Sequence, residues 1–161
     1  MLSRLFPKQA GNAYRGHWLG AVLLAVVVAV KGLQGVVSVA MTDEIAKGAD
    51  GIDVSQLNAA GVADLMLSIA LIGFYIVTIS LIGVLVLIRW RALVPLMLLV
   101  QLIAQLGARV VIALHPIPRL AAPENGFAGH PVGFYVNLAL LALTVLGLVL
   151  SLTGKRYRSG P

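Results

Sequence analysis

The sequence predicts an all-α integral membrane protein whose single domain, residues 1–161, is an up-down four-helix bundle with both termini in the cytoplasm. Three observations predict this class: an apolar composition, four segments of spanning length, and basic residues gathered on one side of those segments. Hydrophobic residues make up 60% of the chain and charged residues 11%, and the mean hydropathy is +0.98. A soluble domain is about half apolar and about a quarter charged, so this composition belongs in lipid.

Four segments are long enough to span a membrane, because an apolar helix of about 20 residues crosses a hydrocarbon core about 30 Å thick. They lie at about residues 17–40, 62–88, 92–114 and 132–152. Only the sequence Arg-Trp-Arg separates the second segment from the third, which predicts a tight antiparallel hairpin. The two outer loops, 41–61 and 115–131, are longer and contain glycine and proline turn residues.

The first span and the loop after it carry two local signals. Ser-Val-Ala at residues 38–40 resembles a signal-peptidase site, but the long N-terminal region and Lys31 favour a first span that is retained. In the loop, Asp53 followed by Gln56 predicts a capping box at the start of a helix that leads into the second span.

The lysines and arginines predict the orientation of the bundle, because cytoplasmic loops carry an excess of them. Eight lie before the first span, between the second and third, or after the fourth: Arg4, Lys8, Arg15, Arg89, Arg91, Lys155, Arg156 and Arg158. Only Lys47 and Arg119 lie in the two outer loops. We therefore expect the chain in the cytoplasmic (inner) membrane of a bacterium, with both termini in the cytoplasm and any homo-oligomer parallel.

The composition also excludes several classes of function. The chain has no cysteine, which excludes disulfide and thiolate chemistry. Its net charge of +6 comes mostly from helix ends, where anionic membrane lipid rather than nucleic acid explains it. No nucleophile and base stand in a catalytic pattern, so we expect neither an enzyme nor a cofactor. The layout resembles that of small multidrug exporters, but Lys31 stands where they carry an acid, which argues against cationic drugs.

Polar residues within the spans recur on one face of each helix, which predicts a polar interior. Lys31 lies about 4 Å and Gln105 about 3 Å from the midpoints of their spans, toward the outer side. Six such side chains share one layer and form the candidate ligand-binding site: Lys31, Gln34, Tyr75, Gln105, Arg109 and Asn137. Packing between membrane helices is the alternative role for the uncharged members.

The two cations within the spans differ in what they can reach. Arg109 can extend to the membrane interface or form an ion pair with Asp64 on the second span. Lys31 is too deep to reach the interface, and Asp64 lies about 12 Å further along the axis. We therefore expect Lys31 to be neutral, to be charged beside a water-filled cavity, or to bind an anion or a lipid headgroup together with Arg109.

Two further patterns concern packing and metal binding. Small residues let membrane helices approach closely, which predicts helix contacts at Gly32, Gly35, Gly73, Gly83 and Gly107. His115, Glu124 and His130 are weak candidates for a metal site, because two histidines at the ends of one loop are a weak pattern.

Two functions remain after these exclusions. The first is a polar, cationic pocket in the outer half of the bundle that binds or moves an anionic or lipid-like small molecule. The second is a non-catalytic accessory or assembly subunit of a larger membrane complex, whose polar residues only hold the helices together.

Overall fold

The computed structural model describes residues 2–7, 9–116 and 130–153, whose regular elements are helices. Four of the helices are long: α2 (Trp18–Ala40), α4 (Ala59–Arg89), α5 (Val94–Leu114) and α6 (Val132–Thr153). The short ones are α1 (Leu2–Leu5), α3 (Thr42–Glu44), a π-helical turn (Ile45–Ala49) and two 3₁₀ turns (Val54–Gln56 and Arg91–Leu93). Each long helix is apolar enough to cross a membrane, which confirms the four predicted apolar helices.

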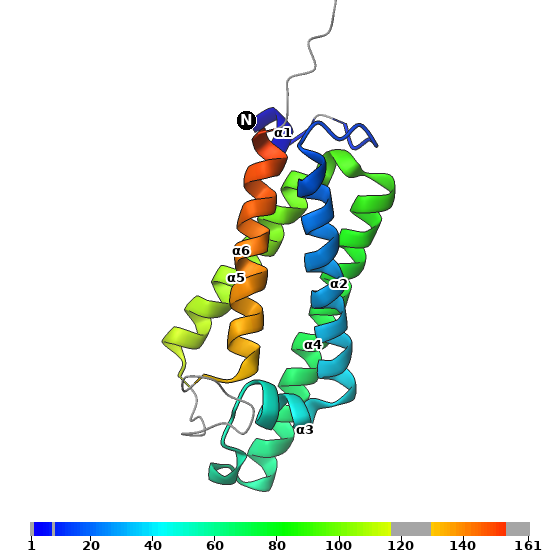
Figure 1. The fold of residues 1–161 in the computed structure, drawn as a ribbon. Coiled ribbons are helices and arrows are strands. Elements are labelled where there is room, and N and C mark those ends of the chain that lie inside the picture. The colour runs from blue at the N-terminus through cyan, green and yellow to red at the C-terminus, as the bar shows by residue number, and fades with distance from the viewer. Residues whose placement is uncertain (1, 8, 117–129, 154–161) are drawn as a thin grey trace, which may run out of the picture.

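Consecutive long helices run in opposite directions (Figure 1). One end of the molecule, the terminal end, holds α1, the α4–α5 connection and the last turn of α6. The other end, the loop end, holds residues 41–58 and the first turn of α6 (Figure 1). Helix α2 packs against α4 and α6, and α6 packs against α5. The short α4–α5 connection is as predicted, but the two helices diverge from it and share little contact.

The start of α4 differs from the prediction. Asp53 does act as a cap, accepting hydrogen bonds from Ser55 N at 3.1 Å and from Gln56 Nε2 at 3.4 Å. These bonds, with that from the Ser55 hydroxyl foremost, lower the pKa of Asp53. The helix that it caps is only the 3₁₀ turn, because Leu57 is extended. Helix α4 begins instead from Asn58, whose Oδ1 accepts from Gly61 N at 2.8 Å.

Glycines bring the backbones of α2 and α4 together. A Cβ atom on Gly35 would lie 2.7 Å from the Gly73 carbonyl oxygen, and one on Gly73 would lie 2.8 Å from the Gly35 carbonyl oxygen. Gly32 faces Ser80, and a Cβ on Gly83 would meet the Val28 side chain at 2.5 Å. These four glycines are at close contacts, as predicted. The prediction for Gly107 is wrong, because nothing lies within 4 Å of its Cβ position.

The glycine contacts decide which way the polar residues of α4 point. Gly73 and Gly83 face α2, so the stripe on the other side of the helix faces outward: Asp64, Ser68, Tyr75 and Thr78, all exposed. Ser68 and Thr78 donate to the carbonyl oxygens of Asp64 and Phe74, at 2.8 and 3.0 Å. Their hydroxyls need no partner on another helix, so the prediction that this stripe points into the bundle is wrong.

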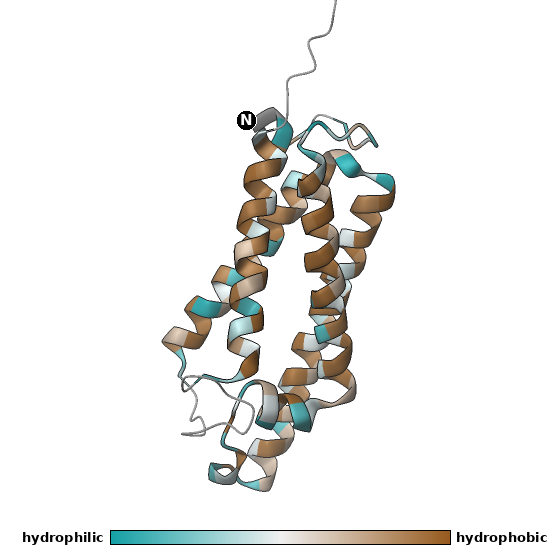
Figure 2. Cartoon of the chain, viewed as in Figure 1, coloured by the Kyte–Doolittle hydropathy of each residue, from teal (hydrophilic) through white to brown (hydrophobic). Residues whose placement is uncertain are grey.

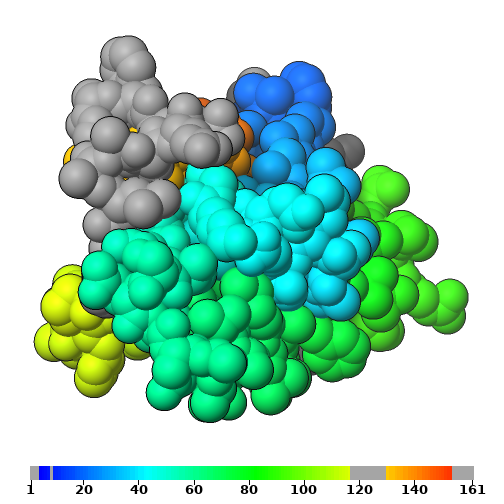
Figure 3. All heavy atoms as spheres, turned by 90° about the horizontal axis from the view of Figure 1, so that it is seen from below, coloured from blue at the N-terminus to red at the C-terminus, as the bar shows by residue number. Residues whose placement is uncertain are grey.

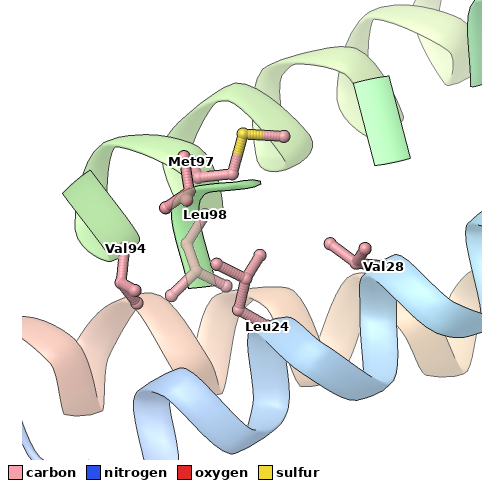
Figure 4. Packing of buried hydrophobic residues seen from close by; sticks show 6 residues of the cluster. Leu24, Val28, Val94, Met97 and Leu98 are labelled. Atoms are coloured by element: carbon pink, nitrogen blue, oxygen red, sulfur yellow. The ribbon is translucent and has the colours of Figure 1, made fainter. Parts of the chain in front are cut away.

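A cluster of buried apolar side chains lies toward the terminal end. Leu24 and Val28 of α2 interlock there with Val94, Met97 and Leu98 of α5 (Figure 4). Apolar residues make up most of each long helix (Figure 2), and many of their side chains are exposed on the outward surfaces. Such surfaces are stable in hydrocarbon and unstable in water, which agrees with helices that span a membrane.

Tyr14 supplies a pH-dependent contact at the terminal end. Its hydroxyl donates to the His17 carbonyl oxygen at 2.9 Å. Burial raises the pKa of Tyr14 to about 12, an effect that the nearby Arg4 charge partly opposes. Because this pKa exceeds the value of 10.0 for a free tyrosine, the stabilisation is complete below pH 10 and is lost as pH rises through 12.

We therefore expect one tyrosine titration step near pH 12 that Tyr14→Phe removes, measured by the ultraviolet absorbance of phenolate. The free energy of unfolding of the parent should fall relative to that of Tyr14→Phe between pH 10 and 12. Tyr75, which is exposed, offers the control variant Tyr75→Phe. Loss of the step near pH 12 in the Tyr75 variant alone would contradict this assignment.

Candidate functional site

A cavity of about 380 Å³ lies among the four long helices, toward the loop end. Each helix contributes to its wall: Lys31 from α2, Ile76 from α4, Gln105 and Arg109 from α5, and Asn137 from α6. The cavity is partly open rather than enclosed. The candidate site is therefore built by the whole fold and by no single segment.

The cavity continues the face of α5 that forms the core. Val94, Leu98 and Gln101 are buried on this face near the terminal end, and Gln105 and Ala108 follow on it one and two turns later. An alanine fills much less space than the leucine two to three turns before it. The cavity lies where the small side chain of Ala108 takes the place of a leucine on this face.

Lys31 is held by an amide whose orientation is fixed. Its Nζ donates to Asn137 Oδ1 at 2.5 Å. Asn137 Nδ2 donates to the Gly133 carbonyl oxygen one turn earlier, at 2.8 Å, so the amide oxygen must face the lysine. An ammonium group has three N–H donors, and this bond uses one of them. Lys31 therefore keeps donors with which to bind a group in the cavity.

Gln105 is fixed by a buried chain of hydrogen bonds. Thr144, which is fully buried, donates its single hydroxyl proton to the Leu140 carbonyl oxygen at 2.7 Å. It can therefore only accept from Gln105, whose Nε2 lies 2.9 Å away. This leaves Gln105 Oε1 buried without a donor among the described residues. The amide thus has an unmet acceptor beside the cavity.

Arg109 packs on an aromatic ring instead of pairing with an acid. Its guanidinium carbon lies 5.5 Å from the centre of the Phe134 ring, a cation–π contact. The predicted ion pair with Asp64 is wrong: within the described part of the chain, the one ion pair joins Lys47 to Asp43 at 2.8 Å. Because α4 diverges from α5 and turns its glycine face to α2, Asp64 points away from Arg109.

Asp50 lines the cavity, and sequence reasoning missed it. On sequence grounds only Asp64 is considered as an acid for Lys31, but the π-helical turn folds back against the start of α6 and brings Asp50 to the same cavity. A Cβ on Gly133 would lie 2.6 Å from the Ala49 carbonyl oxygen, so only glycine permits this contact. Gly51 then reverses the chain at a φ of 63°. In the sequence, the glycines around Asp50 predict a turn, but they do not indicate which helix that turn packs against.

The structure brings together four of the six predicted binding residues: Lys31, Gln105, Arg109 and Asn137. Gln34 is partly buried on α2 but does not line the cavity. Tyr75 is 63% exposed on the outward face of α4, so its predicted place in the site is wrong. The apolar residues of the cavity wall were also missed, Ile76 and Phe134 among them, because an apolar side chain in an apolar span does not stand out in the sequence.

The structure adds no support to the weak metal prediction. His115 is exposed, and His130 stacks on Phe134 at 4.5 Å between ring centres. Glu124 lies outside the described residues. Within residues 2–7, 9–116 and 130–153, no three His, Asp or Glu side chains gather as a metal site requires. The metal site stays a prediction.

The charges on the cavity wall favour an anionic guest. Lys31 and Arg109 contribute two positive charges and Asp50 one negative charge, a sum of +1. Lysine and arginine side chains can donate hydrogen bonds of the stronger, charge-assisted kind to carboxylate or phosphate oxygens. Comparison with protein-family models, with curated proteins and with solved structures finds no match for this chain.

Proposed function

We propose that this protein sits in the inner membrane of a bacterium and binds or moves an anionic small molecule in the Lys31 cavity. The observation that carries the proposal is the pair of cations, Lys31 and Arg109, on one cavity that lies among spanning helices. Charged side chains inside membrane segments are costly and usually face cavities or substrate paths. Neither cation forms an ion pair in the described part of the chain, so an anion would complete the site.

The proposed topology is an up-down four-helix bundle with both termini in the cytoplasm. The excess of lysine and arginine beside the terminal end supports this orientation. It puts the loop end, and with it the cavity, in the outer half of the membrane. Any homo-oligomer of such a chain is parallel.

The direct test compares Lys31→Met with a control lysine. Methionine keeps the length of the side chain and removes its charge and donors. Lys47 suits the control Lys47→Met, because it lies in a half-exposed surface pair with Asp43. Native mass spectrometry of the gently extracted parent should show a bound anion, which Lys31→Met loses and Lys47→Met retains. Equal retention by both variants would contradict the proposal.

A second candidate function is that of an accessory subunit, and the outward polar face of α4 favours it. Asp64 and Tyr75 lie on this face, and no helix among the described residues packs on it. In a parallel homo-oligomer paired through α4, the two Asp64 carboxylates would meet at the same depth and repel. A different protein with a hydrogen-bond donor at that depth fits the face better.

Photo-crosslinking distinguishes this second function from the first. A crosslinking amino acid at Tyr75 should capture one defined protein in cells, whereas the same group at Val110, exposed on α5, should capture lipid only. If both positions capture only lipid, the accessory function loses its support.

A further inference from the structure

We infer that the guest of the Lys31 cavity is a monoanionic amphiphile, whose acidic headgroup lies between Lys31 and Arg109 and whose apolar chain leaves between α4 and α5. This inference rests on the proposed function and names the chemical class of its ligand. Fatty acids and phosphodiester lipids such as phosphatidylglycerol share this chemistry.

The net charge of the cavity wall favours a guest that carries a single negative charge. Asp50 shares the wall with the two cations, so one bound negative charge brings the three side chains and the guest to neutrality. A second negative charge, as on a phosphate monoester, would lie near the Asp50 carboxylate without a matching cation. In a site of low dielectric, such an unmatched charge is strongly disfavoured.

The other walls are apolar and lead toward lipid. Ile76 of α4 and Ala108 and Ile112 of α5 line the side of the cavity where these two helices share little contact. Helix α5 diverges from α4 toward the loop end (Figure 1). Ala108 and Ile112 are both exposed, so this side faces the hydrocarbon of the membrane.

The loop end is partly covered. Seen along the helices from that end, residues 41–58 lie over the middle of the molecule, in cyan to teal (Figure 3). A guest that arrives from water meets this cover, whereas one that arrives from the outer leaflet does not. The volume of 380 Å³ is at the small end of the range of about 300 to 1,000 Å³ for ligand pockets. It accommodates a headgroup and the start of a chain, with the rest of the chain in lipid.

The preference for an amphiphile with one negative charge is tested by native mass spectrometry of the full chain. Four probes are offered in turn: oleate, phosphatidylglycerol, phosphatidylcholine and acetate. We expect oleate and phosphatidylglycerol to bind and the other two to bind at least about tenfold less. Asp50→Asn raises the wall charge to +2, so it should shift preference toward phosphatidic acid, which carries a second negative charge. Lys31→Met should weaken oleate binding by about 10- to 100-fold, as loss of a charge-assisted hydrogen bond does.

The lateral route is tested by two neighbouring positions on α5. Ala108→Trp fills the side of the cavity next to α4, and Gly107→Trp places the same bulk where nothing lies within 4 Å. We expect the first variant to lose oleate binding and the second to keep it. Ala113→Trp is a second cavity variant, and circular dichroism verifies the helix content of all three.

The outcomes separate this inference from the function on which it rests. If acetate binds as well as oleate, or if Ala108→Trp and Ala113→Trp fold and keep oleate, the amphiphile inference is wrong and the anion site stands. If no anionic probe binds the parent, both fail. If phosphatidylcholine binds as well as phosphatidylglycerol, the inferred preference for a guest with one negative charge is wrong.

Discussion

Gly35→Ala and Gly73→Ala should each destabilise the protein by about 3 kcal/mol, because an added methyl group overpacks the contact between α2 and α4. In both cases the new Cβ lies under 3 Å from a carbonyl oxygen of the facing helix, and a backbone atom cannot move aside as a side chain can. The two helices must therefore separate along their whole contact, which is the most extensive in the fold.

The measurement is unfolding in mixed micelles as the fraction of denaturing detergent rises, followed by circular dichroism. Gly107→Ala is the matched control, because nothing surrounds that position. Alanine has a higher helix propensity than glycine, so the control should be neutral or stabilising by up to about 1 kcal/mol. Equal losses at Gly35 and Gly107 would mean that α2 and α4 do not meet through their glycines.

Asn137→Leu should destabilise the protein by about 2 kcal/mol, because it removes the acceptor of the Lys31 ammonium within the spanning region. Replacing both residues, by Lys31→Met and Asn137→Leu together, should cost less than Asn137→Leu alone. The double variant leaves no ammonium group without a partner, and apolar residues of similar volume often replace such pairs at little cost.

The double-mutant cycle is measured by the same unfolding experiment, without added anions that would pair with the lysine. Ser68→Ala is a control, since among the described residues its hydroxyl bonds within its own helix, so the loss should be small and additive with Lys31→Met. Additive effects of the Lys31 and Asn137 substitutions would show that the two side chains do not interact.

The number and positions of the long helices followed from the sequence, because length and hydropathy decide which segments can cross a membrane. The rotation of each helix did not follow. On α4, one face carries Gly73 and Gly83 and another carries Asp64 and Tyr75, and polarity alone favoured the second face for the interior. Close packing against α2 selected the first.

The site was predictable to the same degree. Depth could be estimated for Lys31, Gln105 and Arg109, because the rise per residue of a helix is constant. Tyr75 was estimated to lie at a similar depth, but its side chain points outward. The depth of a residue does not tell which way its helix is rotated. Asp50 was missed because a loop residue has no calculable depth, and its place depends on the contact between Gly133 and Ala49.

The length of α4 makes the molecule responsive to the thickness of its bilayer. The uncharged stretch of α4 between Asp64 and Arg89 has 24 residues and is about 36 Å long, against a hydrocarbon core of about 30 Å. Helices that exceed the local thickness tilt to reduce the mismatch. Helix α2 must tilt with α4, because their glycine contact joins the two backbones. Helix α5 shares little contact with α4 and need not follow, so a thinner membrane changes the angle between α4 and α5 and with it the width of the gap beside Arg109.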